Sequence, residues 1–593
     1  MNYSDETYLS TLKRYFGYDS FRSIQLDIIR SIGSGRNTLG LMPTGGGKSI
    51  TFQVPALVMD GVCIVISPLI ALMKDQVQHL KKRGIKAEAI YSGLSHKEVQ
   101  RILDNTIFGA VKFLYISPER LSNKLFLAKL YYMKVCFIVV DEAHCISQWG
   151  HDFRPSYMQI SKLLQILLDH ADTQANKNNS DHFTIPPVLA LTATATKQVI
   201  KDITRSLSIE PEDAEHWNVL SMSFRRKNLS YVVRNTEDKF RELMHIVNSV
   251  DGSVIVYTRN RERTKELSDM INAEGISATF YHAGLDFSIK ERRQDQWQAD
   301  EVRIMVATNA FGMGIDKPNV RLVIHMDCPD SIEAYFQEAG RAGRDGERAY
   351  AVLLCNGSDT SALTKRINTT FPPKEYIRQV YEHLAYYFEL AINCGEGVRY
   401  EFNESEFCRR FKHYPTHLEH ALAILQNAGY INYEHDHTDR ARVIITTSRY
   451  ELYDLNLSHT EEKIINALLR NYGTLFTDMT FIDFSLLCRK TALTTEAIHQ
   501  DLKSLAQRRV IRYLPPRQIP IITYLRQRTD AEHIKIDHEI YEDARQRMKT
   551  HIDSMLQYIN ENDTCRERML MEYFGEETKE DCGHCDVCLQ DRN

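Results

Sequence analysis

The sequence predicts an α/β protein with two parallel-sheet domains, followed by winged-helix-like modules and a C-terminal helical zinc-binding subdomain. Through the first 360 residues, short apolar strands alternate with helical patterns, which is typical of parallel sheets covered by helices. Residues 371–530 carry two cycles of helices followed by strands, and four cysteines with metal-ligand spacing lie after residue 564. The expected domains are residues 1–208, 209–360, 371–450, 455–530 and 535–593.

Composition bounds the classes of protein that the chain can represent. Its 593 residues exceed one hydrophobic core, and 43% hydrophobic with 25% charged residues is typical of globular proteins. A net charge of −5 excludes a uniformly basic surface, although a basic groove would be hidden in that sum. The N-terminus lacks a signal pattern, and no apolar run reaches the roughly 18 residues of a membrane span. We therefore expect a cytoplasmic protein, nucleoid-associated if bacterial, with no membrane contact and no disulfides.

A glycine-rich turn follows the first predicted strand, residues 37–42. It comprises Pro43, Thr44, Gly45, Gly46, Gly47, Lys48 and Ser49 and runs into a predicted helix. Glycines let successive backbone N–H groups surround a phosphate, Lys48 can reach its oxygens, and the Ser49 hydroxyl can ligate Mg²⁺. Met42 stands where the strict pattern has glycine, so a chance glycine-rich turn is the alternative. The flanking strand and helix favour a phosphate-binding loop.

An acidic pair follows a second buried strand. The strand, residues 137–140, is short, apolar and β-branched, and it delivers Asp141 and Glu142 at its C-terminal end. Parallel sheets bind ligands at this edge. One carboxylate can hold a metal through water while its neighbour polarises the attacking water. The sequence therefore predicts a nucleotide hydrolysis site.

Aromatic residues crowd the segment just after the acidic pair. Trp149, Phe153 and Arg154 lie beside Gly150 and Pro155, which indicates an ordered loop rather than a helix. Exposed aromatic rings with an arginine suit base stacking and phosphate contact. The alternative is that Trp149 and Phe153 are ordinary core residues.

Two arginines three residues apart close the second α/β region. Arg341 and Arg344 belong to the run Gly-Arg-Ala-Gly-Arg and should share one helical face. Arginines presented toward a γ-phosphate stabilise the charge that develops during its transfer. A solvated basic turn is the alternative, but the phosphate loop and acidic pair favour an arginine finger.

This set of motifs resembles the RecQ family of DNA helicases, in helicase superfamily 2. The resemblance covers roughly residues 11–356, and its most specific part is Ser-Gln-Trp-Gly-His-Asp-Phe-Arg-Pro after Asp-Glu-Ala-His. It implies two RecA-like domains that use ATP to unwind duplex DNA with 3′ to 5′ polarity in repair, recombination and replication. Single-stranded and duplex DNA are the implied partners, and the oligomeric state is left open.

The resemblance also implies roles for individual residues. Tyr18, Arg22 and Gln25 resemble adenine contacts, which suits the hydrogen-bonding amide of Gln25 and the planar group of Arg22. Residues 44–49 resemble the nucleotide-binding loop, with Lys48 on phosphate and Ser49 on Mg²⁺. Asp141 resembles the ligand of Mg²⁺-bound water and Glu142 the general base. Arg341 and Arg344 resemble the γ-phosphate sensor and finger, and residues 146–155 the loop that couples single-strand binding to hydrolysis.

Residues 507–528 form the more basic of the two expected wings. Six arginines lie there without an acidic residue, at positions 508, 509, 512, 517, 526 and 528. A solvated strand edge would account for some of them, but the number favours a surface that follows phosphates. We therefore expect Arg512 and Arg517 to contact DNA, with strands 510–514 and 519–524 forming a hairpin. Its tip, residues 514–519, is a hypothetical strand-separating element.

The last cysteines predict a structural zinc site. Cys582, Cys585 and Cys588 are spaced by two residues, and Cys565 supplies a fourth thiolate for tetrahedral Zn²⁺. His584 could compete as a ligand, but four cysteines suffice. The pattern resembles the RecQ zinc subdomain. In the usual family order, however, that subdomain directly follows the second helicase domain, whereas here winged-helix-like segments precede it.

Two other functions remain as alternatives. The chain could be an RNA helicase or a duplex translocase that does not unwind. It could also be a zinc and winged-helix DNA-binding regulator with a degenerate ATPase half. Intact Lys48, Glu142 and Arg344 disfavour the regulator.

Overall fold

The computed structural model divides the chain into two compact units. The first unit comprises residues 1–364 with 547–593, and the second comprises residues 365–546. The structure describes residues 3–43, 45–91, 94, 96–148, 154–177, 185–312, 317–434, 438–439, 441–447, 451–452, 455, 457–472, 475–476, 478–515, 517–518 and 520–590.

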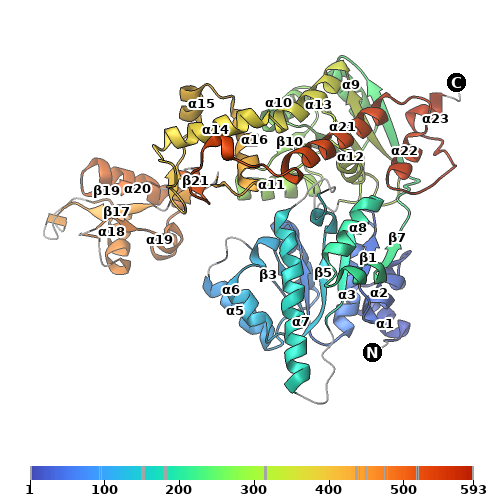
Figure 1. The fold of residues 1–593 in the computed structure, drawn as a ribbon, viewed down its shortest axis with the longest axis horizontal. Helices are drawn as coiled ribbons and strands as arrows, with labels where there is room; N and C mark the ends of the chain where they lie inside the picture. Colours follow the sequence, from blue (N-terminus) through green and yellow to red (C-terminus); the bar gives the residue numbers. More distant parts are fainter. Residues whose placement is uncertain are drawn as a thin grey trace. The chain divides into compact units, whose positions relative to one another are not determined.

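A seven-stranded parallel sheet organises the N-terminal part of the first unit (Figure 1). Its strand order is β3-β4-β2-β5-β6-β1-β7, and its central strands are buried and rich in β-branched residues, as sheets covered on both faces require. The strands are β1 Thr38–Leu41, β2 Val62–Ile66, β3 Ala87–Ile90, β4 Phe113–Ile116, β5 Val135–Val140, β6 Val188–Thr192 and β7 Asn218–Ser221. Because β7 pairs with β1, the sheet continues past residue 208, the expected domain boundary.

Helices and short 3₁₀ turns connect these strands. The helices are α1 Asp5–Phe16, α2 Gln25–Gly33, α3 Lys48–Val58, α4 Ile70–Lys82, α5 His96–Ile107, α6 Lys124–Leu130, α7 Gln159–Lys177 and α8 Lys197–Ser206. The 3₁₀ turns are η1 Pro118–Arg120, η2 Ala143–Ile146, η3 Pro155–Met158 and η4 Pro211–His216. Side-chain caps fix several starts, as where the Thr196 hydroxyl accepts from the Val199 N–H at the start of α8.

A second parallel sheet, of six strands, follows in the same unit with the order β10-β11-β9-β12-β13-β8. Its strands are β8 Leu229–Asn235, β9 Ser253–Tyr257, β10 Ala278–Tyr281, β11 Ile304–Ala307, β12 Val320–His325 and β13 Ala349–Cys355. Its helices are α9 Lys239–Ser249, α10 Arg261–Ala273, α11 Phe287–Gln298, α12 Ile332–Ala339 and α13 Gly357–Thr370. Two parallel sheets of this kind confirm the expected pair of RecA-like domains.

The second unit contains a domain inserted into another domain. We name residues 374–434 with 521–543 the host module and residues 441–515 the inserted module. The host elements are α14 Lys374–Tyr387, β14 Arg399–Glu401, α15 Glu404–Phe411, α16 Pro415–Asn427, β15 Ile431–Glu434, β21 Ile521–Tyr524, η5 Ala531–His533 and the π-helical η6 Glu539–Asp543. The inserted elements are β17 Arg442–Ile445, α18 His459–Asn471, β18 Thr480–Phe481, α19 Phe484–Thr491, α20 Thr495–Gln507 and β19 Ile511–Leu514.

Strand pairing shows how the two modules interleave. The expected hairpin between residues 510–514 and 519–524 is wrong, because β19 pairs with β17 whereas β21 pairs with β14 and β15. The connecting strands β16 Thr438–Asp439 and β20 Arg517–Gln518 pair with each other. The chain therefore leaves the host sheet after β15, builds the inserted module and returns beside its exit as β21.

Each module has its own hydrophobic core. The host core combines residues from before and after the insertion, including Leu418, Ile431 and Ile522. The core of the inserted module draws its buried residues from 441–513, including Val443 and Leu502. Within the described residues, neither core includes a residue of the other module, so each module can be stable without the other.

Three C-terminal helices return to the first unit. They are α21 Ala544–Asn560, which belongs to this unit from residue 547, α22 Arg566–Tyr573 and α23 Asp586–Gln590. The four candidate zinc ligands lie around α22 and α23.

We predict that the host module folds without the inserted one. In the variant, an Asn-Gly turn replaces residues 440–516 and joins Asp439 to Arg517, which already face each other as an antiparallel pair. Because the host core contains no inserted residue, the variant should keep a cooperative thermal unfolding transition by circular dichroism. Aggregation or loss of that transition would contradict the assignment. Ile522→Asp, which buries a charge in β21, is the destabilised reference.

Candidate nucleotide site and zinc centre

The glycine-rich loop connects β1 to the N-terminus of α3. Gly45 and Gly47 have φ of +85° and +79°, the left-handed region that glycine adopts without strain. Gly47 caps α3, whose first residue is Lys48. The loop and Ser49 thus lie at a helix N-terminus, which attracts phosphate. Thr44 lies outside the described residues.

The side-chain amide of Gln25 holds this loop through its carbonyls. Its side-chain Nε2 donates to the carbonyls of Gly46 at 3.3 Å and Gly47 at 3.2 Å, and its Oε1 accepts from the Arg22 N–H at 2.8 Å. A Cβ on Gly47 would lie 2.3 Å from that Nε2, so the contact requires glycine. Gln25 is buried, while Tyr18 is 51% exposed and Arg22 is also exposed. The support that Gln25 gives the loop was not apparent from the sequence.

The acidic pair lies at the end of β5, facing the loop. Lys48 Nζ is 3.6 Å from Glu142 Oε1, and both side chains are largely buried. Glu142 has a φ of +47°, and its N–H donates to Asp141 Oδ1 at 3.0 Å. Tyr157 O–H donates to the Asp141 carbonyl at 2.9 Å. The structure thus brings together the predicted Lys48, Asp141 and Glu142.

The adjacent carboxylates of Asp141 and Glu142 favour a bound cation. Burial, together with the Glu142 carboxylate, raises the pKa of Asp141 to about 6, although Lys48 opposes the shift. Ser67 Oγ donates to Asp141 Oδ2 at 3.4 Å. Among the described residues, Glu142 Oε2 has no hydrogen-bond partner. Two adjacent carboxylates, Asp141 partly buried and Glu142 buried, fit a site for a divalent cation and water.

His144 joins β5 to the end of β6. Its Nδ1 lies 3.0 Å from Thr192 Oγ1, and Thr192 Oγ1 donates to the Thr194 carbonyl at 3.1 Å. His144 is buried, and its Nδ1 is also 3.5 Å from Glu142 Oε2. This chain connects the acidic pair to the hydroxyl-rich strand end. The sequence contained the residues, His144 in Asp-Glu-Ala-His and three threonines from the end of β6 onward, but did not indicate their contact.

The aromatic-rich segment is partly described. Trp149 and Phe153 lie outside the described residues, 149–153 being absent from them. Arg154 is described: its Nη1 donates to the Pro68 carbonyl at 3.1 Å, and its N–H donates to the Cys145 carbonyl at 2.9 Å. Arg154 therefore anchors the end of this segment to the loop after β2.

Arg341 and Arg344 lie in the turn after α12, so the expectation that they share one helical face is wrong. Arg341 is 3% exposed, and a Cβ on Gly312 would lie 3.0 Å from its Nη2. Arg344 packs over the phosphate loop, because a Cβ on Gly45 would lie 3.3 Å from Arg344 Cγ. The second sheet therefore presents Arg344 to the loop of the first sheet.

Three of the six arginines of residues 507–528 have partners within the fold. Arg508 pairs with Glu461 at 3.0 Å, Arg526 stacks on Tyr430, and Arg528 donates to the Leu390 carbonyl. Arg512 is exposed on β19. The Arg517 side chain lies outside the described part. An acidic side chain, an aromatic ring and a backbone carbonyl, all far away in sequence, thus account for three charges that looked uncompensated.

Four cysteines converge as predicted. Their Sγ atoms lie within 4.8 Å of one another, with Cys582 to Cys588 and Cys585 to Cys565 both at 4.0 Å. Tetrahedral Zn–S bonds of about 2.3 Å place sulfurs about 3.8 Å apart, so this set fits zinc.

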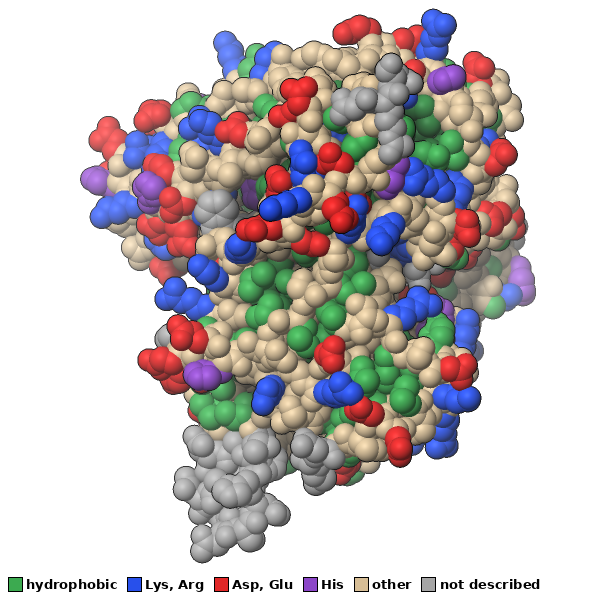
Figure 2. Space-filling model, turned by 90° about the vertical axis from the view of Figure 1, so that its right-hand side faces the viewer, with side chains coloured by type: hydrophobic (Ala, Val, Ile, Leu, Met, Phe, Trp, Pro, Cys, Tyr) green, Lys and Arg blue, Asp and Glu red, His purple; other side chains and the backbone are tan. Residues whose placement is uncertain are grey.

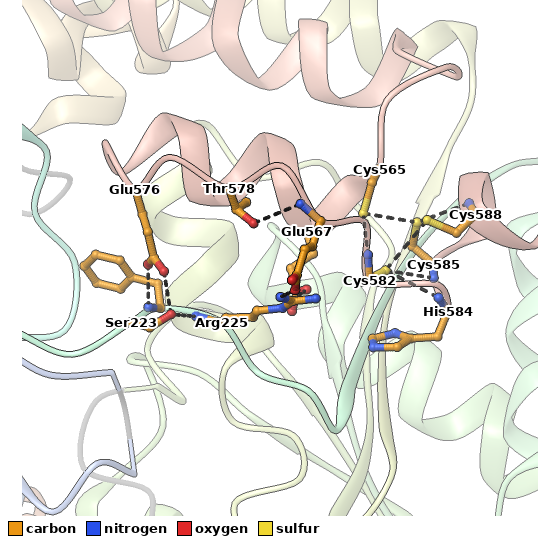
Figure 3. Close-up of polar contacts among 12 residues, drawn as sticks. Ser223, Arg225, Cys565, Glu567, Glu576, Thr578, Cys582, His584, Cys585 and Cys588 are labelled. Carbon is orange, nitrogen blue, oxygen red and sulfur yellow. Dashed lines mark hydrogen bonds and ion pairs between the residues drawn. The ribbon is translucent and has the colours of Figure 1, made fainter. Parts of the chain in front are cut away.

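Hydrogen bonds around the cluster support thiolate ligands. Backbone N–H groups donate to sulfur, as from Cys582 to Cys565 Sγ at 3.2 Å and from Cys588 to Cys585 Sγ at 3.4 Å. The His584 ring is turned away from the sulfurs, its Nδ1 lying 3.3 Å from Ser230 Oγ (Figure 3). His584 is therefore not among the converging ligands.

The zinc subdomain holds the segment that joins the two sheets. Glu576 accepts from the Phe224 N–H at 2.9 Å and from the Ser223 hydroxyl at 2.5 Å (Figure 3). Arg225 Nε is 3.0 Å from Glu567 Oε2, and its Nη1 is 2.8 Å from Glu580 Oε2. These contacts attach the zinc subdomain between β7 and β8.

On the face drawn in Figure 2, basic and acidic side chains are interspersed without a continuous field of one sign. Within the described ranges, every helix is too short or too polar to cross a bilayer.

Comparisons with protein families identify first the class and then the family. The two sheet domains match the DEAD/DEAH box helicase family over residues 22–203 and the helicase conserved C-terminal domain over residues 238–346, which define a helicase core. The RecQ helicase winged-helix domain of Bacteroidota matches residues 443–515, and the RecQ zinc-binding family matches residues 524–589. The chain belongs to the RecQ family, as its motifs predicted.

Individual relatives agree with this assignment. The ATP-dependent DNA helicase RecQ of Haemophilus influenzae is 40% identical over 68% of this chain and 60% of its own length. The RecQ protein of Bacillus subtilis is 44% identical over 59% and 56%, and the probable ATP-dependent DNA helicase RecS of Bacillus subtilis is 42% identical over 58% and 66%. The matched region thus spans a little over half the length of these relatives.

A solved structure resembles this chain in fold. The crystal structure of the DUF1998 helicase MrfA bound to DNA has a TM-score of 0.50 and 17% identity. The match covers 72% of this chain and 61% of that chain.

We predict that zinc stabilises the C-terminal subdomain. Cys585→Ser removes one of four converging thiolates and should reduce bound zinc, measured by atomic emission, from one per chain to none. The melting temperature should fall, because metal binding contributes directly to folding. Cys394→Ser, at an exposed cysteine outside the cluster, is the matched control and should keep zinc. Full zinc retention by Cys585→Ser would contradict the four-cysteine site.

Proposed function

We propose that this protein is an ATP-dependent DNA helicase that unwinds duplex DNA with 3′ to 5′ polarity in repair, recombination and replication. The observation that carries the proposal is the convergence of Lys48, Glu142 and Arg344 around one phosphate-sized loop. The curated relatives from Haemophilus influenzae and Bacillus subtilis are named ATP-dependent DNA helicases.

The loop residues would hold the nucleotide. Backbone N–H groups of residues 44–47 and the Lys48 ammonium would bind phosphate oxygens, while Ser49 and Asp141 would hold Mg²⁺. Bound ATP with Mg²⁺ would supply the phosphoanhydride bond to be cleaved. Tyr18 and Arg22 are exposed beside Gln25 and would bracket the adenine.

The remaining polar residues would act on the attacking water. Glu142 Oε2, which has no hydrogen-bond partner in the described part of the chain, would accept the proton of that water. Lys48 Nζ, 3.6 Å from Glu142 Oε1, would hold that side chain in place beside the water. Arg341 and Arg344 would stabilise negative charge on the transferred phosphoryl group as sensor and finger.

DNA would bind to the residues that the sequence analysis predicted as DNA contacts. Trp149 and Phe153 would stack on single-stranded bases and couple their binding to hydrolysis, with Arg154 fixing the end of the segment on Pro68. Arg512, exposed on β19, and Arg517 would contact duplex phosphates.

A tailed-duplex assay tests the proposed activity. With ATP and Mg²⁺, the protein should unwind a 3′-tailed DNA duplex and leave the matching 5′-tailed duplex intact. DNA should stimulate ATP hydrolysis more than RNA of the same sequence. Stimulation by RNA alone would favour an RNA helicase, and stimulation by DNA without unwinding would favour a duplex translocase; either result refutes the proposal.

Glu142→Gln should separate nucleotide binding from hydrolysis. The amide keeps the shape of the side chain but cannot accept the proton, so kcat should fall by about 100-fold or more. Binding of a fluorescent ATP analogue should change little, because Lys48 and the glycine loop remain. Unchanged turnover would show that another group is the base. Glu274→Gln, at a helix C-terminus remote from these strand ends, is the matched control.

A further inference from the structure

The turn that carries Arg341 and Arg344 ends a helix and must satisfy exposed carbonyls. Helix α12 ends at Ala339, and Gly343 then adopts a φ of +61°. The last carbonyls of a helix lack intrahelical donors and carry partial negative charge. The direction of Arg344 therefore depends on what holds the carbonyls of Gly340, Ala342 and Gly343.

A single guanidinium holds all three carbonyls. Arg226 Nη2 donates to the carbonyls of Ala342 at 3.0 Å and Gly343 at 2.8 Å, and its Nη1 donates to Gly340 at 3.4 Å. In the described part of the chain, no carboxylate forms an ion pair with Arg226. Burial lowers the pKa of Arg226, but an arginine starts so high that it stays protonated. Its charge is directed at the turn.

Asn228 completes the support. Its Nδ2 donates to the carbonyls of Gly343 at 2.7 Å and Glu347 at 2.9 Å. A Cβ on Gly343 would lie 2.5 Å from that Nδ2, so the turn can approach only because residue 343 is glycine. The segment before β8 thus fixes the turn from one side.

The neighbouring arginine is directed elsewhere. Arg225 forms ion pairs with Glu567 and Glu580 of the zinc subdomain. Among the described residues, its side chain makes no hydrogen bond to the turn carbonyls that Arg226 holds. Adjacent residues of one type therefore have separate partners. This difference supplies a matched control within two residues.

We propose that Arg226 is a positioning residue for ATP hydrolysis, which fixes the turn that directs Arg344 at the phosphate loop. The proposal rests on the proposed function, because it requires Arg344 to act on bound ATP. Among the described residues, no hydrogen bond or ion pair joins Arg226 to the glycine loop or to the acidic pair. It acts through the backbone of the turn, whose Arg344 packs on Gly45.

A double-mutant cycle tests this role in the full-length protein. Arg226→Gln should lower the DNA-stimulated kcat by about 10-fold to 100-fold, the range expected when a catalytic group is misplaced by about 1 Å. The KM for ATP and the zinc content should change little. Added to Arg344→Ala, the same change should have no further effect, because its target is already gone. A multiplicative loss in the double variant would overturn the proposal.

Two further variants keep the test decisive. Arg226→Lys retains the charge but cannot reach three carbonyls, so its kcat should fall between those of wild type and Arg226→Gln. If the glutamine variant does not fold, the lysine variant enters the cycle in its place. Arg225→Gln should lower the melting temperature more than kcat. Equal kcat losses in Arg225→Gln and Arg226→Gln would show that any disturbance of the segment joining the two sheets lowers kcat. That result would overturn the proposal.

Wild-type controls distinguish a failure of the Arg226 role from a failure of the proposed helicase function. Absence of DNA-stimulated hydrolysis in wild type would overturn the proposed function and the role of Arg226 together. Normal wild-type hydrolysis with a multiplicative cycle would overturn only the role of Arg226. An unchanged kcat in Arg344→Ala would show that Arg344 is not an arginine finger. The positioning role of Arg226 would then be overturned as well.

Discussion

Parallel strands bring their carboxyl ends to one edge of a sheet, and the candidate nucleotide site depends on this constraint. β1 ends in the glycine loop and β5 ends in Asp141 and Glu142, so residues almost a hundred positions apart in the sequence meet at one edge. Burial at that edge has an electrostatic cost, visible in the raised pKa of Asp141. Lys48 offsets part of the cost, and a divalent cation would offset more.

Prediction from sequence succeeded where chemistry is local and failed where pairing is distant. The phosphate loop, the acidic pair and the four cysteines each carry their chemistry in a short run, and the structure brings each set together. The winged-helix region is different. Strand propensity indicated the segments around Tyr513 and Tyr524, but a nearby hairpin partner was assumed. Residue 522 instead pairs across an insertion with residue 433, and nothing in the residues near residue 522 encodes that distant partner.

Side-chain contacts to backbone were also beyond prediction. Gln25 was interpreted as an adenine contact, yet its amide also holds the carbonyls of Gly46 and Gly47. The arginines of the basic wing looked uncompensated, yet Arg508 has its counter-charge in Glu461, forty-seven residues earlier. In both cases the residue type was read correctly, but its partner is a group that only the folded chain brings close. Buried polar groups need such partners, but they do not announce them in the sequence.

The segment from Ser223 to Asn228 shows how these distant partners combine. It is the only covalent link between the two sheets, and in six residues it meets the zinc subdomain and the arginine turn. A flexible link would let the second sheet present Arg344 in many directions. Selecting one of these directions at the site would then cost conformational entropy. Contacts on both sides of the link reduce that freedom before nucleotide binds. In the described structure, the zinc subdomain contributes no residue to the nucleotide loop. Its contribution is to hold the segment that joins the two sheets, and through that segment the position of Arg344.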